Sequence, residues 1–196
     1  MVLEKLNPLT RGNEKLDNSI FGWSITPIKS CLNCASCKDT CYAIKSYNQY
    51  PNVKTAWDRN LELAKSGDFQ VAVIGQLERA RIVKSVRIHV AGAFISQKYI
   101  DQWVYVASKF PELNFYGYTK VMERFDFSNL TYLDNVNIIN SIATDGKKNY
   151  GDQDRIDELL ALDYVLCPAT VKGNKVTCGK DCHICITEEK VCFIEH

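Results

Sequence analysis

The sequence predicts an α/β protein whose parallel sheet is built from successive strand–helix units. Three observations support this fold class. Apolar segments of strand length alternate with segments that repeat apolar residues at helical spacing. Hydrophobic residues make up 46% and charged residues 24% of the 196 residues, as in an ordinary globular protein. No linker, repeat or low-complexity tract divides the chain, so we expect a single domain over residues 1–196.

The first half of the chain predicts two strands with helices between them. The segment "IFGWSITPI", residues 20–28, is expected to form the first strand. A helix is expected from Pro51 to Gly67, because apolar residues recur there on one helical face. Asp68 is expected to cap a second helix, and "VRIHVAGAF", residues 86–94, reads as the next strand.

The second half repeats this alternation. Ser96 is expected to start a helix that Pro111 stops. The segments "LNFYGYTK", residues 113–120, and "VNIINSIA", residues 136–143, predict two more strands, and a short helix is expected around residues 156–160. Four strands separated by helices therefore predict a sheet of βα units.

The expected strands carry polar side chains at alternating positions. A parallel strand covered by helices on both faces is instead apolar almost throughout. We therefore predict an open or partial (β/α) barrel with one face under helices and a polar face that lines a cavity. A sheet with one face in water is the alternative. The polar sets are Arg87 with His89, Asn114 with Tyr116, Tyr118 and Lys120, and Asn137 with Ser141.

Charge and segment composition exclude some partners and locations. The 24 Lys and Arg residues nearly balance 23 Asp and Glu residues, so nucleic acid is not indicated. The N-terminal residues show no signal-peptide pattern, and no run approaches the ~20 apolar residues of a membrane span. We expect a cytoplasmic protein, in which clustered cysteines are metal ligands or redox thiols more often than disulfides.

The first cysteine run, residues 31–41, reads "CLNCASCKDTC". Its spacing, C-x2-C-x2-C-x3-C, is the bacterial ferredoxin pattern, although Tyr42 stands where ferredoxins have proline. A continuous run suits a cubane, whose irons take ligands from several directions, better than zinc, which is usually held by two separated C-x2-C pairs. We predict that this run binds a [4Fe–4S] cluster through Cys31, Cys34, Cys37 and Cys41.

A second cysteine group lies in the tail, residues 167–196, which we expect to pack on the α/β domain. Its spacing is C-x10-C-x3-C-x2-C, and we predict that Cys167, Cys178, Cys182 and Cys185 hold a second [4Fe–4S] cluster. One cluster with a zinc site, or two zinc sites, are the alternatives. His183 is interpreted as a hydrogen-bond donor beside the thiols and Cys192 as a buried apolar cysteine.

Four side chains outside the cysteine groups are candidates for substrate contacts. Tyr118 and Lys120 lie near the end of their expected strand, the edge at which βα-barrels keep their chemistry. Lys120 could bind an anion and Tyr118 could donate a proton or a hydrogen bond. His89 could act as an acid or base, and Arg87 could face a cluster or pair with a carboxylate. Each of these residues also has a purely structural interpretation, and residues 143–152 could form a closing loop.

A partial barrel with cysteines after its first strand resembles radical S-adenosylmethionine enzymes in architecture only. Those enzymes carry C-x3-C-x2-C after strand one. Here that order occurs only at Cys178, Cys182 and Cys185, near the end of the chain, and "HVAGAF" is a weak match to their glycine-rich turn. The fold alone would not transfer the activity.

A closer resemblance rests on several segments in order: "CYA", "VRIHVAGAFISQKYIDQW", "FYGYTK", "LCPATVKGNKVTCGKDCHICI" and "VCFIEH". Together they resemble the phage gene product eighty-eight family, small cysteine-rich proteins of bacteriophages and mobile elements. The resemblance runs over residues 17–196 and implies that both cysteine groups belong to one pattern, in the cytoplasm of a bacterial host. It implies no settled biochemical role.

Two departures from the family pattern stand out. The family reads Gly-Asp-Phe where this chain has Gly92-Ala93-Phe94. This chain therefore lacks the aspartate carboxylate. If that carboxylate is catalytic or binds a ligand in the family, its function would be absent here. One extra residue lies between Cys178 and Cys182, which a loop can absorb.

Three functions remain open from the sequence. The leading hypothesis is a redox or sulfur-transfer enzyme with two [4Fe–4S] clusters, acting on a small-molecule substrate or with a redox partner protein. The second is a ferredoxin-like electron carrier without a substrate. The third is a zinc-stapled module that binds a host protein or nucleic acid. In the first hypothesis the substrate is positioned by Arg87, His89, Tyr118 and Lys120.

Overall fold

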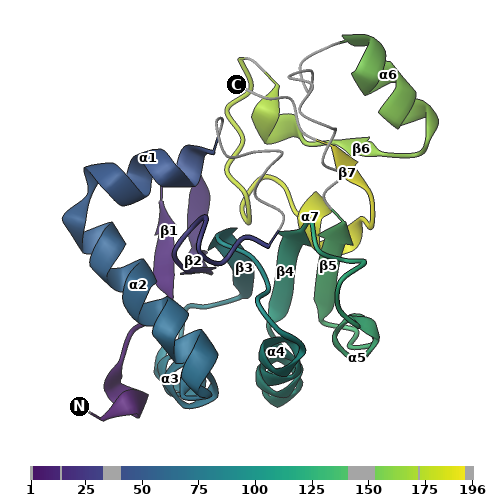
Figure 1. Ribbon diagram of the computed structural model, residues 1–196. Helices are drawn as coiled ribbons and strands as arrows, with labels where there is room; N and C mark the ends of the chain where they lie inside the picture. Colours follow the sequence, from purple (N-terminus) through teal and green to yellow (C-terminus); the bar gives the residue numbers. More distant parts are fainter. Residues whose placement is uncertain (1, 14, 33–40, 141–152, 172, 193–196) are drawn as a thin grey trace.

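The main sheet has five strands in the order β1-β2-β3-β4-β5 (Figure 1). The computed structural model describes residues 2–13, 15–32, 41–140, 153–171 and 173–192. Strand β1 (Thr10–Asn13) runs antiparallel to β2, and the other neighbours pair in parallel. The parallel strands are β2 (Leu16–Ser24), β3 (Ser85–Ala91), β4 (Asn114–Thr119) and β5 (Val136–Asn140). The predicted α/β class with a mostly parallel sheet is confirmed, while β1 was not expected.

The helices between the strands begin and end close to the predicted signals. Pro51 occupies the first turn of α2, which ends at Gly67 in the left-handed region (φ 94°). The Ser96 side chain caps α4 by accepting a hydrogen bond from the Tyr99 amide at 3.2 Å. These helices are α1 (Tyr42–Gln49), α2 (Pro51–Ser66), α3 (Phe69–Arg79), α4 (Gln97–Lys109) and α5 (Ser128–Thr131). A 3-10 turn, η1 (Leu3–Lys5), precedes the sheet.

The last part of the chain forms short elements. Strands β6 (Val165–Leu166) and β7 (Val191–Cys192) pair in parallel as a second sheet. Between them lie η2 (Pro168–Thr170) and α7 (Ile184–Thr187), and α6 (Gln153–Ala161) comes just before β6. In Figure 1 the tail, with β6, α7 and β7, lies on the side of the main sheet opposite α3, α4 and α5.

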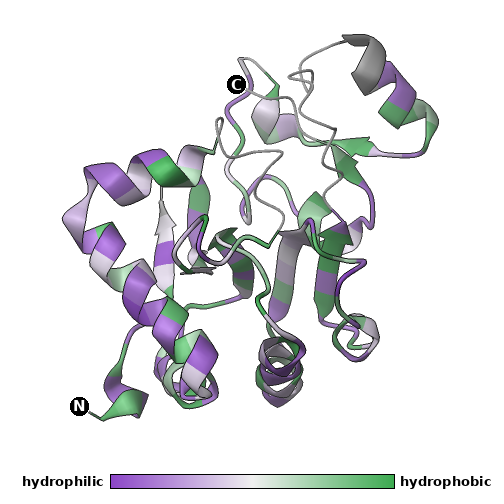
Figure 2. Ribbon diagram, viewed as in Figure 1, coloured by the Kyte–Doolittle hydropathy of each residue, from purple (hydrophilic) through white to green (hydrophobic). Residues whose placement is uncertain are grey.

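The main core lies between the sheet and the helices. Its largest members are Trp23, Phe69, Tyr99 and Trp103, which are fully buried and meet edge to face or tilted, with Trp23 and Phe69 centroids 4.9 Å apart. Figure 2 shows long hydrophilic stretches along α1 and α2 and hydrophobic colour along β5. Burial of this aromatic cluster is the principal source of stability for the sheet–helix body.

The opposite face of the sheet is covered by the tail. Helix α7 packs on β4 and β5, and Cys178, Cys185 and Ile186 pack on a small cluster of Leu16, Ile20 and Tyr116. The Asn137 side-chain amide donates to the carbonyls of Cys185 (3.1 Å) and Glu188 (2.9 Å). The polar alternation in the strands therefore provides a docking face for the tail.

Strand β3 contains an irregularity that changes the predicted direction of one side chain. Gly22 pairs with Arg87 while Ser24 pairs with Ala91, so β3 bulges between these pairs, and His89 has a φ of 56°. As a result the His89 ring contacts Phe94 and Tyr99 on the helix side. The prediction that Arg87 and His89 share one face is wrong, because the bulge turns the backbone between them.

Candidate metal centre and adjacent cavity

The tail cysteines are placed by backbone pairing with the first parallel strand. Cys178 donates its amide to the Lys15 carbonyl (3.0 Å) and accepts from the Asp17 amide (2.9 Å). Gly179 follows with φ 83°, and a Cβ there would lie 2.5 Å from the Ile20 side chain. Its amide donates to the Cys182 carbonyl at 2.9 Å, which closes the turn between the two cysteines.

The other two cysteines of this group come from separate tail elements. Cys167 follows β6 and donates its amide to the Cys192 carbonyl at 2.8 Å. Cys185 lies in α7, and its thiol accepts a hydrogen bond from the Tyr118 hydroxyl at 2.5 Å. Tertiary packing thus gathers thiols from four positions of the tail, with Cys178 beside β2, Cys185 on β4 and Cys167 beside β5.

The thiols of this group interact electrostatically with one another. Burial raises the pKa of Cys167, Cys178 and Cys185, the last to about 11. Neighbouring thiols add to each shift, and the nearby Arg87 guanidinium opposes it. Without a bound cation these three thiols would therefore be protonated near neutral pH.

Arg87 lies under the tail, beside these thiols. Its guanidinium carbon is 5.8 Å from the centroid of the Tyr118 ring, and its Nε is buried without a hydrogen-bond partner. The charge interacts with Cys185, Cys178 and Cys167. No carboxylate within the described ranges forms an ion pair with it. A half-buried cation whose Nε is shielded from water is stabilised by an anion nearby.

The first cysteine run is described only at its ends. Cys34 and Cys37 lie outside the described residues, while Cys31 and Cys41 are among the described ones and are half-buried. The Tyr42 hydroxyl, next to Cys41, donates to the Val90 carbonyl of β3. The two described cysteines are therefore held near the end of β3.

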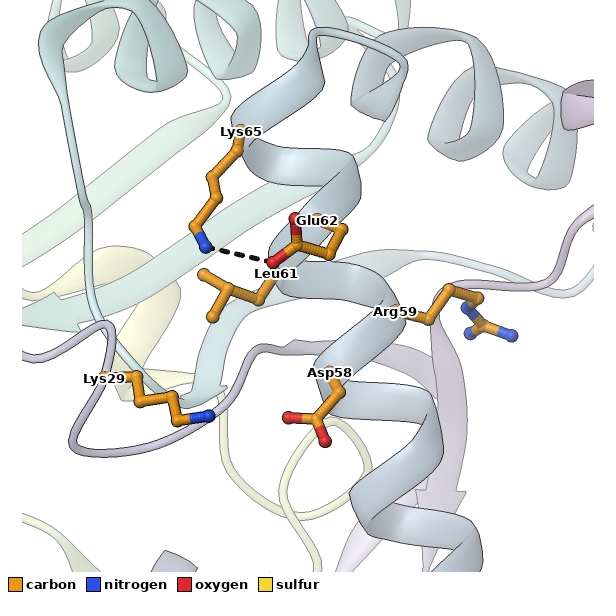
Figure 3. A pocket seen from close by; sticks show the side chains of 6 residues that line it. All are labelled: Lys29, Asp58, Arg59, Leu61, Glu62 and Lys65. Atoms are coloured by element: carbon orange, nitrogen blue, oxygen red, sulfur yellow. Dashed lines mark hydrogen bonds and ion pairs between the residues drawn. The ribbon is translucent and has the colours of Figure 1, made fainter.

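A carboxylate on α2 fixes the segment that leads into this run. Asp58 accepts hydrogen bonds from the hydroxyls of Thr26 (2.5 Å) and Tyr47 (2.7 Å), and the Ser30 hydroxyl donates to the Thr26 carbonyl at 2.6 Å. The Thr26 hydrogen bond is the main cause of a lowered pKa at Asp58. Figure 3 shows Lys29 reaching toward the same carboxylate from the opposite side of a surface hollow.

That hollow has a volume of about 400 Å³ and is lined by the side chains in Figure 3, among them Lys29, Asp58 and Glu62. Cations and carboxylates alternate around it, and Glu62 pairs with Lys65 at 2.9 Å. None of the predicted site residues lines it. Through Asp58 it adjoins the segment that leads into the first cysteine run.

A smaller cavity of about 180 Å³ lies at the carboxyl ends of β3 and β4. Three of the four predicted substrate residues line it: His89, Tyr118 and Lys120. Cys31 and Cys41 line it as well, so the cavity adjoins the first cysteine run. Arg87 does not line it and lies instead with the tail cysteines.

His89 is neutral in this environment. Its Nε2 lies 3.0 Å from the Tyr99 hydroxyl, and its Nδ1 is buried without a partner. Burial lowers its pKa to about 3. Burial therefore favours the neutral form of the ring, which is hydrogen-bonded to Tyr99.

The described thiols do not converge on a single ion. Within the part of the chain that the structure describes, no group of three or more Cys, His, Asp or Glu side chains is arranged to hold a metal ion. A tetrahedral zinc needs every sulfur at about 2.3 Å from one centre. A cubane takes each thiolate at a different corner, so its ligands are spread more widely.

Several positioning residues were not predicted from the sequence. Asp58, Tyr47 and Thr26 form the hydrogen-bonded support of the first run, and Asn137 holds the tail. In the sequence, the sign of this hydrogen-bonded support was the presence of hydroxyl-bearing residues on both sides of the cysteine run. The partner on α2 could not be identified, because it lies 32 residues from Thr26.

Among the comparisons with known proteins, the comparison with family models gave a match. No curated protein and no solved structure matches the chain. No described helix has the length and apolar character needed to cross a membrane. The family model of Gene product 88 matches residues 2–163, which include the first cysteine run, the cavity and the whole main sheet. The tail cysteines lie beyond the match. The protein belongs to the phage family Gene product 88.

Proposed function

We propose that this protein is an iron–sulfur redox or sulfur-transfer enzyme that holds two [4Fe–4S] clusters beside the cavity at the strand ends. One cluster would be held by Cys31, Cys34, Cys37 and Cys41, and the other by Cys167, Cys178, Cys182 and Cys185. The observation that carries the proposal is the Arg87 guanidinium, which lies beside three tail thiols and no described carboxylate.

A guanidinium that is partly withdrawn from water, as Arg87 is, is stabilised by negative charge beside it. Neutral thiols do not supply that charge, and burial raises the pKa of these thiols. Binding of metal keeps cysteines deprotonated, so thiolates on a cluster would neutralise Arg87. Arg87 would in turn stabilise the negatively charged cluster.

The tail group could hold a cluster because its described thiols lie close enough to interact by charge. A cubane takes each thiolate at a different corner, so thiols from several positions of the tail could each supply one ligand. The Tyr118 hydroxyl, which donates to the Cys185 sulfur at 2.5 Å, would stabilise thiolate charge on the same cluster.

When bound, clusters of this kind supply single-electron transfer. The protein itself would hold the two clusters on either side of the strand ends. Tyr118 lies between them, because its hydroxyl donates to the Cys185 sulfur and its side chain also lines the cavity. The four parallel strands are in sequential order, which is the arrangement of a partial (β/α) barrel. We include that architecture, and a cytoplasmic site of action in the bacterial host, in the proposal.

The test is anaerobic purification followed by iron, sulfide and zinc analysis. The proposal expects brown protein with about eight irons and eight sulfides per chain. Replacing Cys178 and Cys182 with serine should halve the iron, whereas Cys192→Ser, the matched control, should leave it unchanged. Colourless protein with stoichiometric zinc would overturn the proposal in favour of a zinc-stapled module.

Arg87→Met tests the observation that carries the proposal. Without metal, removal of the half-buried cation should be neutral or stabilise the fold by about 1 kcal/mol. With metal, iron should leave the tail site about tenfold faster, whereas Arg87→Lys should retain part of the effect. Equal iron release in Arg87→Met and wild type would show that Arg87 has no part in holding the cluster.

A further inference from the structure

Among the described residues that line it, the cavity at the ends of β3 and β4 combines apolar side chains with one cation, Lys120. Val90 and Ala93 follow the bulge of β3, and Val121 follows β4, so carbon atoms form much of its lining. Lys120 directly follows β4 and is half-buried at the same place. The carboxyl ends of parallel strands are where α/β proteins bind their ligands.

Lys120 has no carboxylate partner in the part of the chain that the structure describes. No acidic side chain is among the described residues that line the cavity, and no ion pair to Lys120 occurs there. By contrast, Lys65 at the surface is paired with Glu62 at 2.9 Å. A half-buried ammonium group in apolar surroundings gains most from an anionic ligand.

We infer that this cavity binds a small organic carboxylate, with the carboxylate group on Lys120 and its carbon atoms against Val90, Ala93 and Val121. The inference rests on the proposed function, because it names the class of substrate for the same site. A volume of about 180 Å³ is close to the volume that roughly six water molecules occupy in liquid water. The ligand is therefore a molecule of a few carbon atoms.

The walls favour an organic acid over an inorganic anion. Phosphate and sulfate bind where several donors converge, such as backbone nests or arginine clusters. Here Lys120 is accompanied by the side chains of Tyr42, Tyr118 and Thr119 and by carbon-rich walls, with no arginine among the described lining residues, so an anion with an apolar end buries more of its surface. A competing use of Lys120 is to neutralise thiolates at Cys31 and Cys41, which line the same cavity.

The test uses the protein as purified anaerobically, with propionate and its neutral analogue propionamide as probes in calorimetry. We expect propionate to bind at least tenfold more tightly than propionamide, and inorganic phosphate to bind more weakly than propionate. Lys120→Gln should weaken propionate binding at least tenfold, and Lys120→Arg should retain most of it. Lys109→Gln, which removes an exposed lysine at the end of α4, is the matched control and should leave it unchanged.

A second variant tests the apolar wall independently of charge. Ala93→Leu fills the cavity and should weaken propionate and propionamide alike, while circular dichroism verifies that the fold is kept. Equal affinity for the two probes, tighter binding of phosphate, or undiminished propionate binding in Lys120→Gln would each overturn the inference. The inference would also be overturned if the wild-type protein bound no propionate and Lys120→Gln altered the visible spectrum. Lys120 would then neutralise the thiolates of Cys31 and Cys41 and would not bind a carboxylate.

Iron analysis separates this inference from the proposed function. Propionate binding to a protein without iron would support the carboxylate site and reject the clusters. A protein with about eight irons but no preference for propionate would reject the carboxylate site alone.

Discussion

The two faces of the main sheet are held by different kinds of interaction. On the helix face, Trp23, Phe69 and Trp103 are fully buried and pack edge to face. On the tail face, Arg87, Tyr118 and Asn137 meet thiols and backbone carbonyls through directed contacts. The helix face therefore folds the chain by burying apolar area, whereas the tail face depends on hydrogen bonds and, in our proposal, on bound clusters.

This difference also separates stability from function. A few lost contacts on the tail face would release the cysteine group without unfolding the sheet–helix body. Substitutions on the helix face would unfold both. The following experiments test this comparison, beginning with the largest expected effect.

Trp103→Ala should destabilise the whole protein by about 3–5 kcal/mol, because it removes a fully buried aromatic side chain from the main core. Urea unfolding followed by circular dichroism measures the loss. Tyr132→Ala is the control, since that side chain is 87% exposed and should change stability by less than about 0.5 kcal/mol. A loss at Trp103 no larger than at Tyr132 would contradict the assignment of stability to the helix face.

The buried His89 should make the helix face sensitive to acid. Its pKa is about 3 in the folded chain, below the ordinary value of about 6.5 in the unfolded chain. The unfolded chain therefore takes up a proton first as pH falls below about 6.5. The stabilising contribution of neutral His89 is complete above that pH and should decline by about 1.4 kcal/mol per pH unit toward pH 3.

Comparison with His89→Asn isolates this effect, because asparagine tolerates the positive φ of 56° at this position and does not titrate. Unfolding free energies measured between pH 7 and 4.5 should fall more steeply for wild type than for the variant. Parallel pH profiles would show that His89 is not the group responsible.

Asn137→Ala should loosen the tail face selectively. It removes the side-chain hydrogen bonds to the carbonyls of Cys185 and Glu188, at a cost of about 1–3 kcal/mol to the docked tail. Hydrogen exchange should rise across α7 and stay unchanged in α3 and α4. Asn135→Ala, which acts at the loop before β5 on the helix side, should leave α7 unchanged. A uniform rise in exchange would show that the two faces unfold together.

Asp58→Asn should have the smallest effect on global stability, below about 1 kcal/mol, because the asparagine oxygen can still accept one hydrogen bond. Locally it should loosen the segment from Thr26 to Cys31, since the hydroxyls of Thr26 and Tyr47 share the present carboxylate. Faster hydrogen exchange in residues 25–31 is the expected signature. Glu62→Gln on the same helix, which only breaks a surface pair with Lys65, is the control.

The sequence identified many of the site residues, but it did not show which of them lie together in the folded chain. The sequence indicated that Tyr118 and Lys120 end a strand, and both line the cavity at that strand end. It placed Arg87 in the same substrate site, whereas the structure puts Arg87 with the tail thiols. It also placed His89 beside Arg87, because strict alternation does not anticipate a bulge in β3.

Local pattern by itself determined the alternation of β2 to β5 with α2, α3 and α4, the bounds of α2 at Pro51 and Gly67, and the cap of α4 at Ser96. It did so because helix and strand periods, and the backbone limits of proline and glycine, act over a few neighbouring residues. Only the tertiary structure decided that the tail covers the polar face and that Cys178 pairs beside Leu16. Such contacts join segments far apart in the chain, and the packing of the whole molecule selects them.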